Sequence, residues 1–501
     1  MAASERHVRA GRRPGRPISA ALALAIAALL AGCGSSDNSR FALVVIGQPA
    51  DPFETGARLS PAGQLSRAAT AEGLVSFDEQ GRVVPALADR WIVTDDGQSY
   101  IFRLRDGTWR NGEPLTAKAA KDALDRAIRA LRGTPLALDL NGIDEIRVMA
   151  SRVVEIRLLR PMPYFLQIMA QPELGLLHDR QGNGPMTIER EDGAVARFTP
   201  IEPSRLGLPV IDKWDRRTRQ LDLAAVPAGE AVRRFNEGDV DLVLGGQIQD
   251  FPLTGSVGIL RGTIQLDPVI GLLGLQVAND RGFLSDPQNR EALSMAIDRQ
   301  ALIAPFGLSG WTSTTRLVSH GVQGDLGPTD ERWGDLSLEE RQARAATRVR
   351  QSNPAGVAGL SVWLPAGPGS DILFARLAAD WRKVGVTVTR APDWDSADLR
   401  LIDEVARYPR VAWFLNRLSC VARRGLCDSG ADALAASAAA VNEPRRRAEI
   451  LSEAEARLTA ANTFIPFGSP IRWSLVRGGV DGFAPNPWGW HPLMPLAWLP
   501  K

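Results

Sequence analysis

The order of apolar and polar positions along the chain predicts a mixture of strands and helices. Residues 41–46 form an unbroken apolar run, as expected of a strand that is covered on both faces. Residues 154–158 alternate between apolar and charged side chains, which predicts a strand with one face toward solvent. Apolar residues recur at helical spacing over 124–131, behind Thr116, a residue type that caps helices. The chain therefore belongs to a mixed α/β class.

Two local patterns specify how elements connect. Residues 91–93 and 100–104 flank Asp95-Asp96-Gly97, which predicts a β-hairpin. A strand at 360–364, a helix closed by Gly385 and a strand at 386–388 predict a β-α-β unit with parallel strands. Further expected elements are a strand at 271–277, a helix from Arg290 to Leu302 and a last long helix that Asn442 caps.

Length and charge bound the class of protein. With 501 residues the chain is long enough for about three domains or two large lobes. Lys+Arg at 59 and Asp+Glu at 57 leave a formal charge of +2, which argues against a nucleic-acid partner held by excess charge. Five of the arginines lie in the first 32 residues, so the rest of the chain is nearly neutral.

Several kinds of chemistry are disfavoured by the residues present. No lysine follows a glycine, so the phosphate-binding loop of P-loop ATPases is absent. The four histidines are far apart, with no HExxH and no CxxC, which predicts no metal site. No GxSxG nucleophile elbow and no dinucleotide fingerprint occur. We therefore expect no cofactor, and the lack of a nucleophile–base constellation disfavours an extracytoplasmic enzyme.

The N-terminus has the features of an export signal. An arginine-rich stretch precedes the apolar segment from Ile18 to Leu30, which is short for a membrane span. The segment ends in Leu30-Ala31-Gly32-Cys33, which resembles the bacterial lipobox, so we expect Cys33 to carry lipid. A polar tether at 33–40 would follow the 1–32 signal peptide. The body is then expected to be periplasmic and anchored to a membrane.

The two other cysteines, Cys420 and Cys427, lie seven residues apart. An extracytoplasmic location permits their oxidation to a disulfide, and the alternative is a pair of reduced, buried thiols.

Seven segments together resemble one family over nearly the whole mature chain: the extracytoplasmic solute-binding proteins of peptide/nickel ABC importers, bacterial family 5. The segments are Glu72–Val75 (EGLV), Val84–Trp91 (VPALADRW), Asp95–Arg105 (DDGQSYIFRLR), Asn111–Ala117 (NGEPLTA), Gly182–Pro185 (GNGP), Gly238–Leu242 (GDVDL) and Arg290–Arg299 (REALSMAIDR). Their number and order carry the resemblance. Most of them are structural, and Asp298-Arg299 is expected to form an ion pair or a cap.

The resemblance implies a two-lobed periplasmic-binding-protein-like α/β fold with an extra domain inserted in the first lobe. Lobe one would comprise residues 41–74, 179–270 and 469–501, the inserted domain 75–178, and lobe two 275–468. The ligand would lie between the lobes, and closure would bury it.

The resemblance also directs attention to candidate ligand contacts. Peptide-binding members carry a segment like WxxDYPDP, whose aspartate pairs with the ammonium group of the ligand. We expect Trp413 to match its tryptophan and Asn416 to replace the aspartate, which weakens the peptide interpretation. Arg417 beside them could favour an anionic ligand. Trp311 and Asp51 are further candidates, because they lie near segments where the family lines its pocket.

The function that the resemblance implies is that of a lipid-anchored binding subunit of an ABC importer. It would capture an oligopeptide or related small solute and deliver it to permease subunits that work with separate ATPases. Nickel chelates, haem, opines and sugars stay open as alternative ligands. A sensor or chaperone without transport is an alternative function.

Overall fold

The computed structural model describes Met1 and residues 40–191, 193–258, 263–327, 333–353 and 358–499. Cys33, the rest of the expected signal peptide and the tether up to Ser39 lie outside the described residues. Arg40, expected at the end of the tether, is instead the first residue of a strand. Among the described residues no helix has the length and apolar character that a membrane crossing requires.

A seven-stranded mixed sheet carries the N-terminal strand at its centre. β1 (Arg40–Ile46) pairs in parallel with the strands on both sides, and its apolar run is buried as predicted. Phe41, Leu43 and Val45 pack into the core around α2 (Pro61–Thr70), whereas Val44 joins the core that includes α6 (Ala228–Glu237). The sheet order is β10 (Met186–Arg190), β11 (Val195–Pro200), β12 (Gln220–Val226), β1, β13 (Leu242–Gly246), β20 (Trp473–Val476) and β14 (Ile264–Leu266).

A second, five-stranded sheet contains the predicted β-α-β unit. β16 (Ala358–Trp363) and β17 (Val386–Arg390) are parallel and are joined by α10 (Pro368–Lys383). Leu373, Leu377 and Trp381 form the buried face of that helix. The sheet order is β17, β16, β18 (Leu399–Val405), β15 (Gly271–Val277) and β19 (Phe464–Gly468).

Two helix boundaries differ from expectation. The stretch from Arg290 to Leu302, expected as one helix, forms two helices, α7 (Pro287–Ala296) and α8 (Arg299–Ile303). The break occurs because the Asp298 carboxylate caps α8 by accepting a hydrogen bond from the Ala301 N–H. The last long helix, α13 (Pro444–Ala461), is capped by Glu443 and not by Asn442.

A four-stranded antiparallel sheet lies within the range expected for the inserted domain. It contains the predicted hairpin, and its order is β4 (Ala88–Val93), β5 (Ser99–Leu104), β7 (Val153–Leu158) and β6 (Ile143–Ala150). The expected boundary after residue 178 falls inside a small hairpin of β8 (Leu177–His178) and β9 (Gln181–Gly182). Elements beside these sheets are β2 (Val75–Phe77), β3 (Val83–Pro85), α3 (Ala117–Ala130), α4 (Pro135–Leu140), α5 (Phe165–Met169), α9 (Leu338–Ser352), α11 (Val411–Arg417), α12 (Ser429–Ala439) and α14 (Leu493–Leu496).

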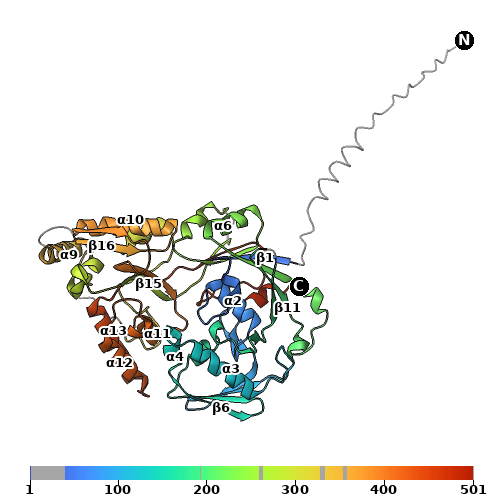
Figure 1. Cartoon of the computed structure of the whole chain (residues 1–501). Coiled ribbons are helices and arrows are strands. Elements are labelled where there is room, and N and C mark those ends of the chain that lie inside the picture. The colour runs from blue at the N-terminus through green and yellow to red at the C-terminus, as the bar shows by residue number, and fades with distance from the viewer. Residues whose placement is uncertain (2–39, 192, 259–262, 328–332, 354–357, 500–501) are drawn as a thin grey trace. The chain divides into compact units, whose positions relative to one another are not determined.

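The small sheet shares its hydrophobic core with helices of the five-stranded sheet's half. Phe102 and Ile156 of the small sheet belong to the same buried cluster as Trp413 and Leu458. Helix α4 contacts α11, as Figure 1 shows. The four-stranded sheet is therefore packed against helices that follow β18 in the chain.

The chain passes between the seven-stranded and five-stranded sheets twice. One passage runs from the end of β14 at Leu266 to the start of β15 at Gly271, and the other from Gly468 of β19 to Trp473 of β20. Arg472 of the second connection lines the cavity described next.

Candidate functional site

A cavity of about 360 Å³ lies between the two large sheets. Its walls include Val45 at the end of β1 and Leu244 of β13 on one side. The other side is formed by residues 403–407, which are the end of β18 and the segment that follows it. We refer to this cavity as the cleft.

Charged side chains dominate one wall of the cleft. Four arginines line it, together with the two carboxylates of Asp403 and Glu404; the arginines are Arg407, Arg417, Arg424 and Arg472. A third carboxylate, Glu173, binds Arg407 from behind. Positive groups therefore outnumber negative ones among these side chains.

Arg407 and Glu173 form a two-pronged ion pair. The guanidinium nitrogens donate to the two carboxylate oxygens at 2.8 and 2.7 Å, and one also donates to Gln171 at 2.9 Å. Burial alone would raise the pKa of Glu173, but Arg407 outweighs that effect and the pKa is lowered. The pair joins Glu173, which precedes β8 in the chain, to the segment after β18.

Glu404 is shared by two arginines. Arg424 forms a close ion pair with it, and the Nε of Arg417 lies 3.6 Å from its other oxygen. Burial raises the pKa of Glu404, yet Arg424 and Arg417 together lower it below its usual value.

Arg417 is the least satisfied of these arginines. Its side chain is 8% exposed, and among the described residues it has no hydrogen bond and no carboxylate nearer than Glu404. Its guanidinium carbon lies 5.2 Å from the ring centre of Trp413. Burial lowers the pKa of Arg417; Glu404 opposes that shift and Arg407 adds to it. An anionic group in the cleft would supply the hydrogen bonds that this buried cation lacks.

Asp403 and Arg472 fix one passage between the sheets to the cleft wall. Arg472 donates to the Asp403 carboxylate at 2.7 Å and to its backbone carbonyl at 3.0 Å. Burial raises the pKa of Asp403, with Arg472 acting against it. The pair links β18 with the segment that leads into β20.

Aromatic side chains from the C-terminal segment form another part of the cleft. Trp488 and Trp490 line it, and the Trp488 indole donates to the carbonyl of Gly81 at 2.8 Å. His491 lies beside them, with its Nε2 3.2 Å from the Asp267 carboxylate. The cleft thus combines an arginine-rich wall with flat apolar surfaces.

The sequence of the chain is similar to that of a known protein family. Residues 82–207 match the sequence model of bacterial extracellular solute-binding proteins, family 5, middle segment. The resemblance to family 5 is confirmed.

Similar proteins agree with the family 5 match. A probable deoxycholate-binding periplasmic protein of Escherichia coli (strain K12) is 24% identical over 82% of this chain and 84% of its own length. The periplasmic murein peptide-binding protein of the same organism is 23% identical over 63% of this chain and 64% of its own. The structure of Haemophilus influenzae OppA in complex with RPPGFSPFR superposes with a TM-score of 0.77 and 17% identity, over 93% and 100% of the two chains. The fold is that of a two-lobed periplasmic binding protein.

Arg417 is the one predicted ligand contact that lines the cleft. Trp413 does not: it is 1% exposed and packs edge-on against Phe414 in the core. Helix α11 turns Trp413 toward the core, so that this indole supports Arg417 from behind.

Asn416 also lies away from the cleft. Its side-chain amide donates to the buried carboxylate of Asp139 at 2.8 Å, and Tyr408 donates to the same oxygen at 2.7 Å. Asn416 therefore helps to join α11 to α4 and borders a different cavity.

The two remaining candidates do not line the cleft either. Asp51 accepts from the backbone N–H of Gln48 at 2.8 Å, within a tight turn after β1. The Trp311 ring packs on Gly468 and its indole donates to the Ser469 carbonyl at 2.9 Å. Both side chains are used in local structure.

Sequence reasoning missed Arg407, although a signal was present. In the family segment WxxDYPDP the aspartate directly precedes a Tyr-Pro pair, and the chain has Tyr408-Pro409 preceded by Arg407. This register places Arg407, rather than Asn416, at the position of the aspartate. It also agrees with the cleft, because Arg407 lines it and Asn416 does not. The charge at this position is thus reversed.

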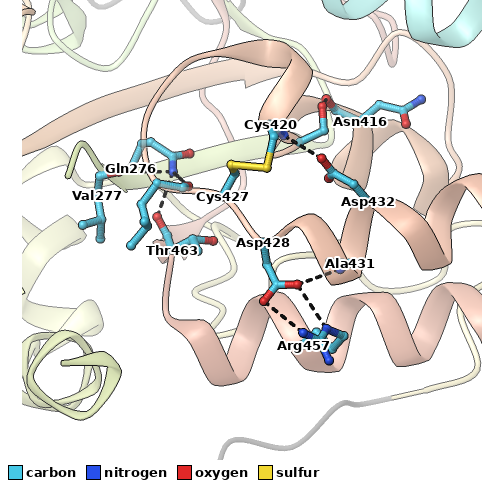
Figure 2. The surroundings of a disulfide bond; sticks show 12 residues. Gln276, Val277, Asn416, Cys420, Cys427, Asp428, Ala431, Asp432, Arg457 and Thr463 are labelled. Carbon is cyan, nitrogen blue, oxygen red and sulfur yellow. Dashed lines mark hydrogen bonds and ion pairs between the residues drawn. A yellow bond between two sulfur atoms is a disulfide. The ribbon is translucent and has the colours of Figure 1, made fainter. Parts of the chain in front are cut away.

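Cys420 and Cys427 form a disulfide that closes a short loop next to β15. Figure 2 shows the side chain of Gln276 reaching this loop; its amide donates to the carbonyl of Leu426 in the loop at 2.8 Å and to that of Thr463, outside the loop, at 2.9 Å. Because Arg424 belongs to the same loop, the disulfide restricts the segment that brings this cation to Glu404.

One group of possible metal ligands occurs among the described residues, although none was expected. Glu113, His178 and Asp179 each place a ligand atom within 4.8 Å of the others. The two carboxylates are exposed, and His178 is engaged with Glu113 at 2.6 Å and stacked on Trp109.

Proposed function

We propose that this chain is the solute-binding subunit of an ABC importer and that its ligand carries a negatively charged group. The ligand would be held in the cleft and released to permease subunits at the membrane. ATP hydrolysis would belong to separate subunits, and the chain itself would catalyse no reaction. Capture would take place outside the cytoplasm, as the periplasmic relatives suggest.

The position of the cleft is the observation that carries the binding role. Its walls come from both large sheets, and only two short passages of chain connect those sheets. Such an arrangement permits the two halves to close on a ligand by small changes in the connections. Closure would exclude water and strengthen the interactions of charged groups in the cleft.

The charges in the cleft support an anionic ligand over a peptide ammonium. Arg407 stands where peptide-binding members have an aspartate, and each carboxylate of the wall already faces an arginine. Of the four cleft arginines, Arg417 has the longest ion pair, at 3.6 Å from Glu404, and no hydrogen bond among the described residues. The similar proteins are named for different ligands, deoxycholate and murein peptide among them, so the ligand class is inferred from this cleft.

Release of the bound compound from purified protein tests this function. We expect a compound with an acidic group, identified by negative-ion mass spectrometry after the protein is denatured. Arg417→Met should retain at least about tenfold less, because a hydrogen bond to a charged group contributes about 1.5–3 kcal/mol. Arg382→Met, on an exposed surface of α10, serves as the matched control.

Two results would contradict the proposal. Equal retention by Arg417→Met and wild type would show that this arginine does not bind the ligand. A catalytic turnover abolished by one substitution would replace the binding role by an enzymatic one.

We further propose that Cys33 is acylated and anchors the protein, since the lipobox-like segment is followed by a small polar stretch. Metabolic labelling with a palmitate analogue should mark wild type and leave Cys33→Ala unmarked. Labelling of both proteins to the same extent would rule out this attachment site.

A further inference from the structure

A second and larger cavity lies between the inserted domain and the helices of lobe two. Its volume is about 1090 Å³, and its walls come from α4, the segment around Tyr164, and helices α11, α12 and α13. We refer to it as the lateral cavity. None of the residues that line the cleft also lines the lateral cavity.

Small side chains on α12 create the space. Ala435, Ala436, Ala438 and Ala439 all line the lateral cavity, where larger residues would fill it. Apolar side chains also stand at its border with unusual exposure: Leu159 at 60%, Leu326 at 55% and Val421 at 48%. Exposed apolar groups beside an apolar hollow mark surfaces that bind an apolar partner.

Three arginines line the lateral cavity without an acidic partner. Arg160, Arg410 and Arg447 have no carboxylate within 4 Å among the described residues. Arg410 lies over the Tyr164 ring at 5.0 Å, and Arg447 donates to the backbone carbonyls of Val441 and Asn442. Burial lowers the pKa of Arg410 and of Arg447, and a neighbouring arginine adds to the shift in each case.

The carboxylates that line the same cavity are all engaged elsewhere. Asp139 accepts from Tyr408 and Asn416, as described above. Asp325 is paired with Arg316 at 2.9 Å. Asp432 accepts from the backbone N–H of Cys420 at 2.9 Å. Asp139 and Asp432 have hydrogen bonds from neutral groups and no ion-pair partner among the described residues, so the three arginines outnumber the two unpaired carboxylates and the unpaired charge of the lateral cavity is net positive.

We propose that the lateral cavity binds an amphipathic anion, whose acidic head group pairs with Arg410 and Arg447 while its hydrocarbon part packs on the alanines of α12. The alanine-lined wall cannot stabilise a charge, and the arginines lack an anion. A molecule with both parts satisfies the two conditions at once. Such a ligand would bridge the inserted domain and lobe two.

Titration with decanoate, followed by calorimetry, tests the proposal directly. We expect one decanoate to bind per protein and decan-1-ol, which lacks the charge, to bind at least about tenfold more weakly. The double variant Arg410→Gln/Arg447→Gln should lose at least about tenfold in decanoate affinity. Arg446→Gln, on the exposed side of α13, should bind as wild type does.

A second pair of variants tests the position of the hydrocarbon part. Ala439→Phe places a ring in the lateral cavity and should abolish decanoate binding, whereas Ala433→Phe, on the exposed face of α12, should not. Thermal unfolding of each variant verifies that it is folded. Absence of decanoate binding to wild type, or binding unaffected by Ala439→Phe, would overturn the proposal. Equal affinity for decanoate and decan-1-ol would overturn the role of the arginines.

Discussion

Replacing Arg407 by alanine is expected to lower the free energy of unfolding by about 3 kcal/mol. The substitution leaves the carboxylate of Glu173 without its two-pronged partner, and that side chain is only 6% exposed. The expected loss is at the low end for a broken buried pair, because Arg67 is close enough to Glu173 for their charges to interact. Urea denaturation at neutral pH measures the effect.

The pH dependence of this loss has a definite sign. The pKa of Glu173 is lowered in the folded protein, so the pair stabilises the fold above the usual carboxyl pKa of 4.5, and that stabilisation disappears as the pH falls through the folded-state value. In Arg407→Ala, burial is no longer opposed by Arg407, and Glu173 should take up a proton more readily. The difference between variant and wild type should therefore shrink in acid.

Two controls separate the ion pair from general effects of substitution. Arg90→Ala removes an exposed arginine that lies 4.0 Å from Asp89 and should change stability by less than about 0.5 kcal/mol. The double variant Arg407→Met/Glu173→Met removes both charges and should recover much of the loss. A single variant as stable as wild type at neutral pH would contradict the assignment.

Replacing Trp413 by alanine is expected to cost about 3–5 kcal/mol of stability. The indole is 1% exposed and packs in the core that the four-stranded sheet shares with α11 and α13. Its removal leaves a cavity where close-packed side chains lose their contacts. Thermal or urea unfolding measures the loss.

The matched control is Trp394→Ala, at a tryptophan that is only partly buried. It should cost clearly less, because less packed surface is lost. Trp413→Phe, which keeps an aromatic ring at the site, should also cost less than Trp413→Ala. If Trp413→Ala instead left stability unchanged and weakened ligand binding alone, the indole would be a ligand contact and its placement in the core would be wrong.

Much of the fold follows from local pattern. The apolar run of β1, the hairpin at Asp95–Gly97 and the β16-α10-β17 unit are all present as predicted. Each depends on residues that are neighbours in sequence, through periodicity and turn chemistry. The order of short motifs was sufficient to indicate the family, because no long-range contact has to be known to compare them.

Tertiary structure decided which residues form the sites. Three residues of α11 that lie close together in sequence point in different directions. Trp413 lies in the core, Asn416 borders the lateral cavity and Arg417 lines the cleft. Local sequence could not distinguish these directions, because they depend on how α11 packs against α4.

The ion pairs of the cleft could not be predicted from local sequence either, as Arg407 shows. Its partner Glu173 is 234 residues away, and Tyr408 finds Asp139 at a separation of 269. The sequence by itself predicted many of the local elements, the resemblance to family 5 and an export signal that stays a prediction. Only packing decided the two cavities and their charges, because burial and the pairing of distant ions arise when remote segments meet.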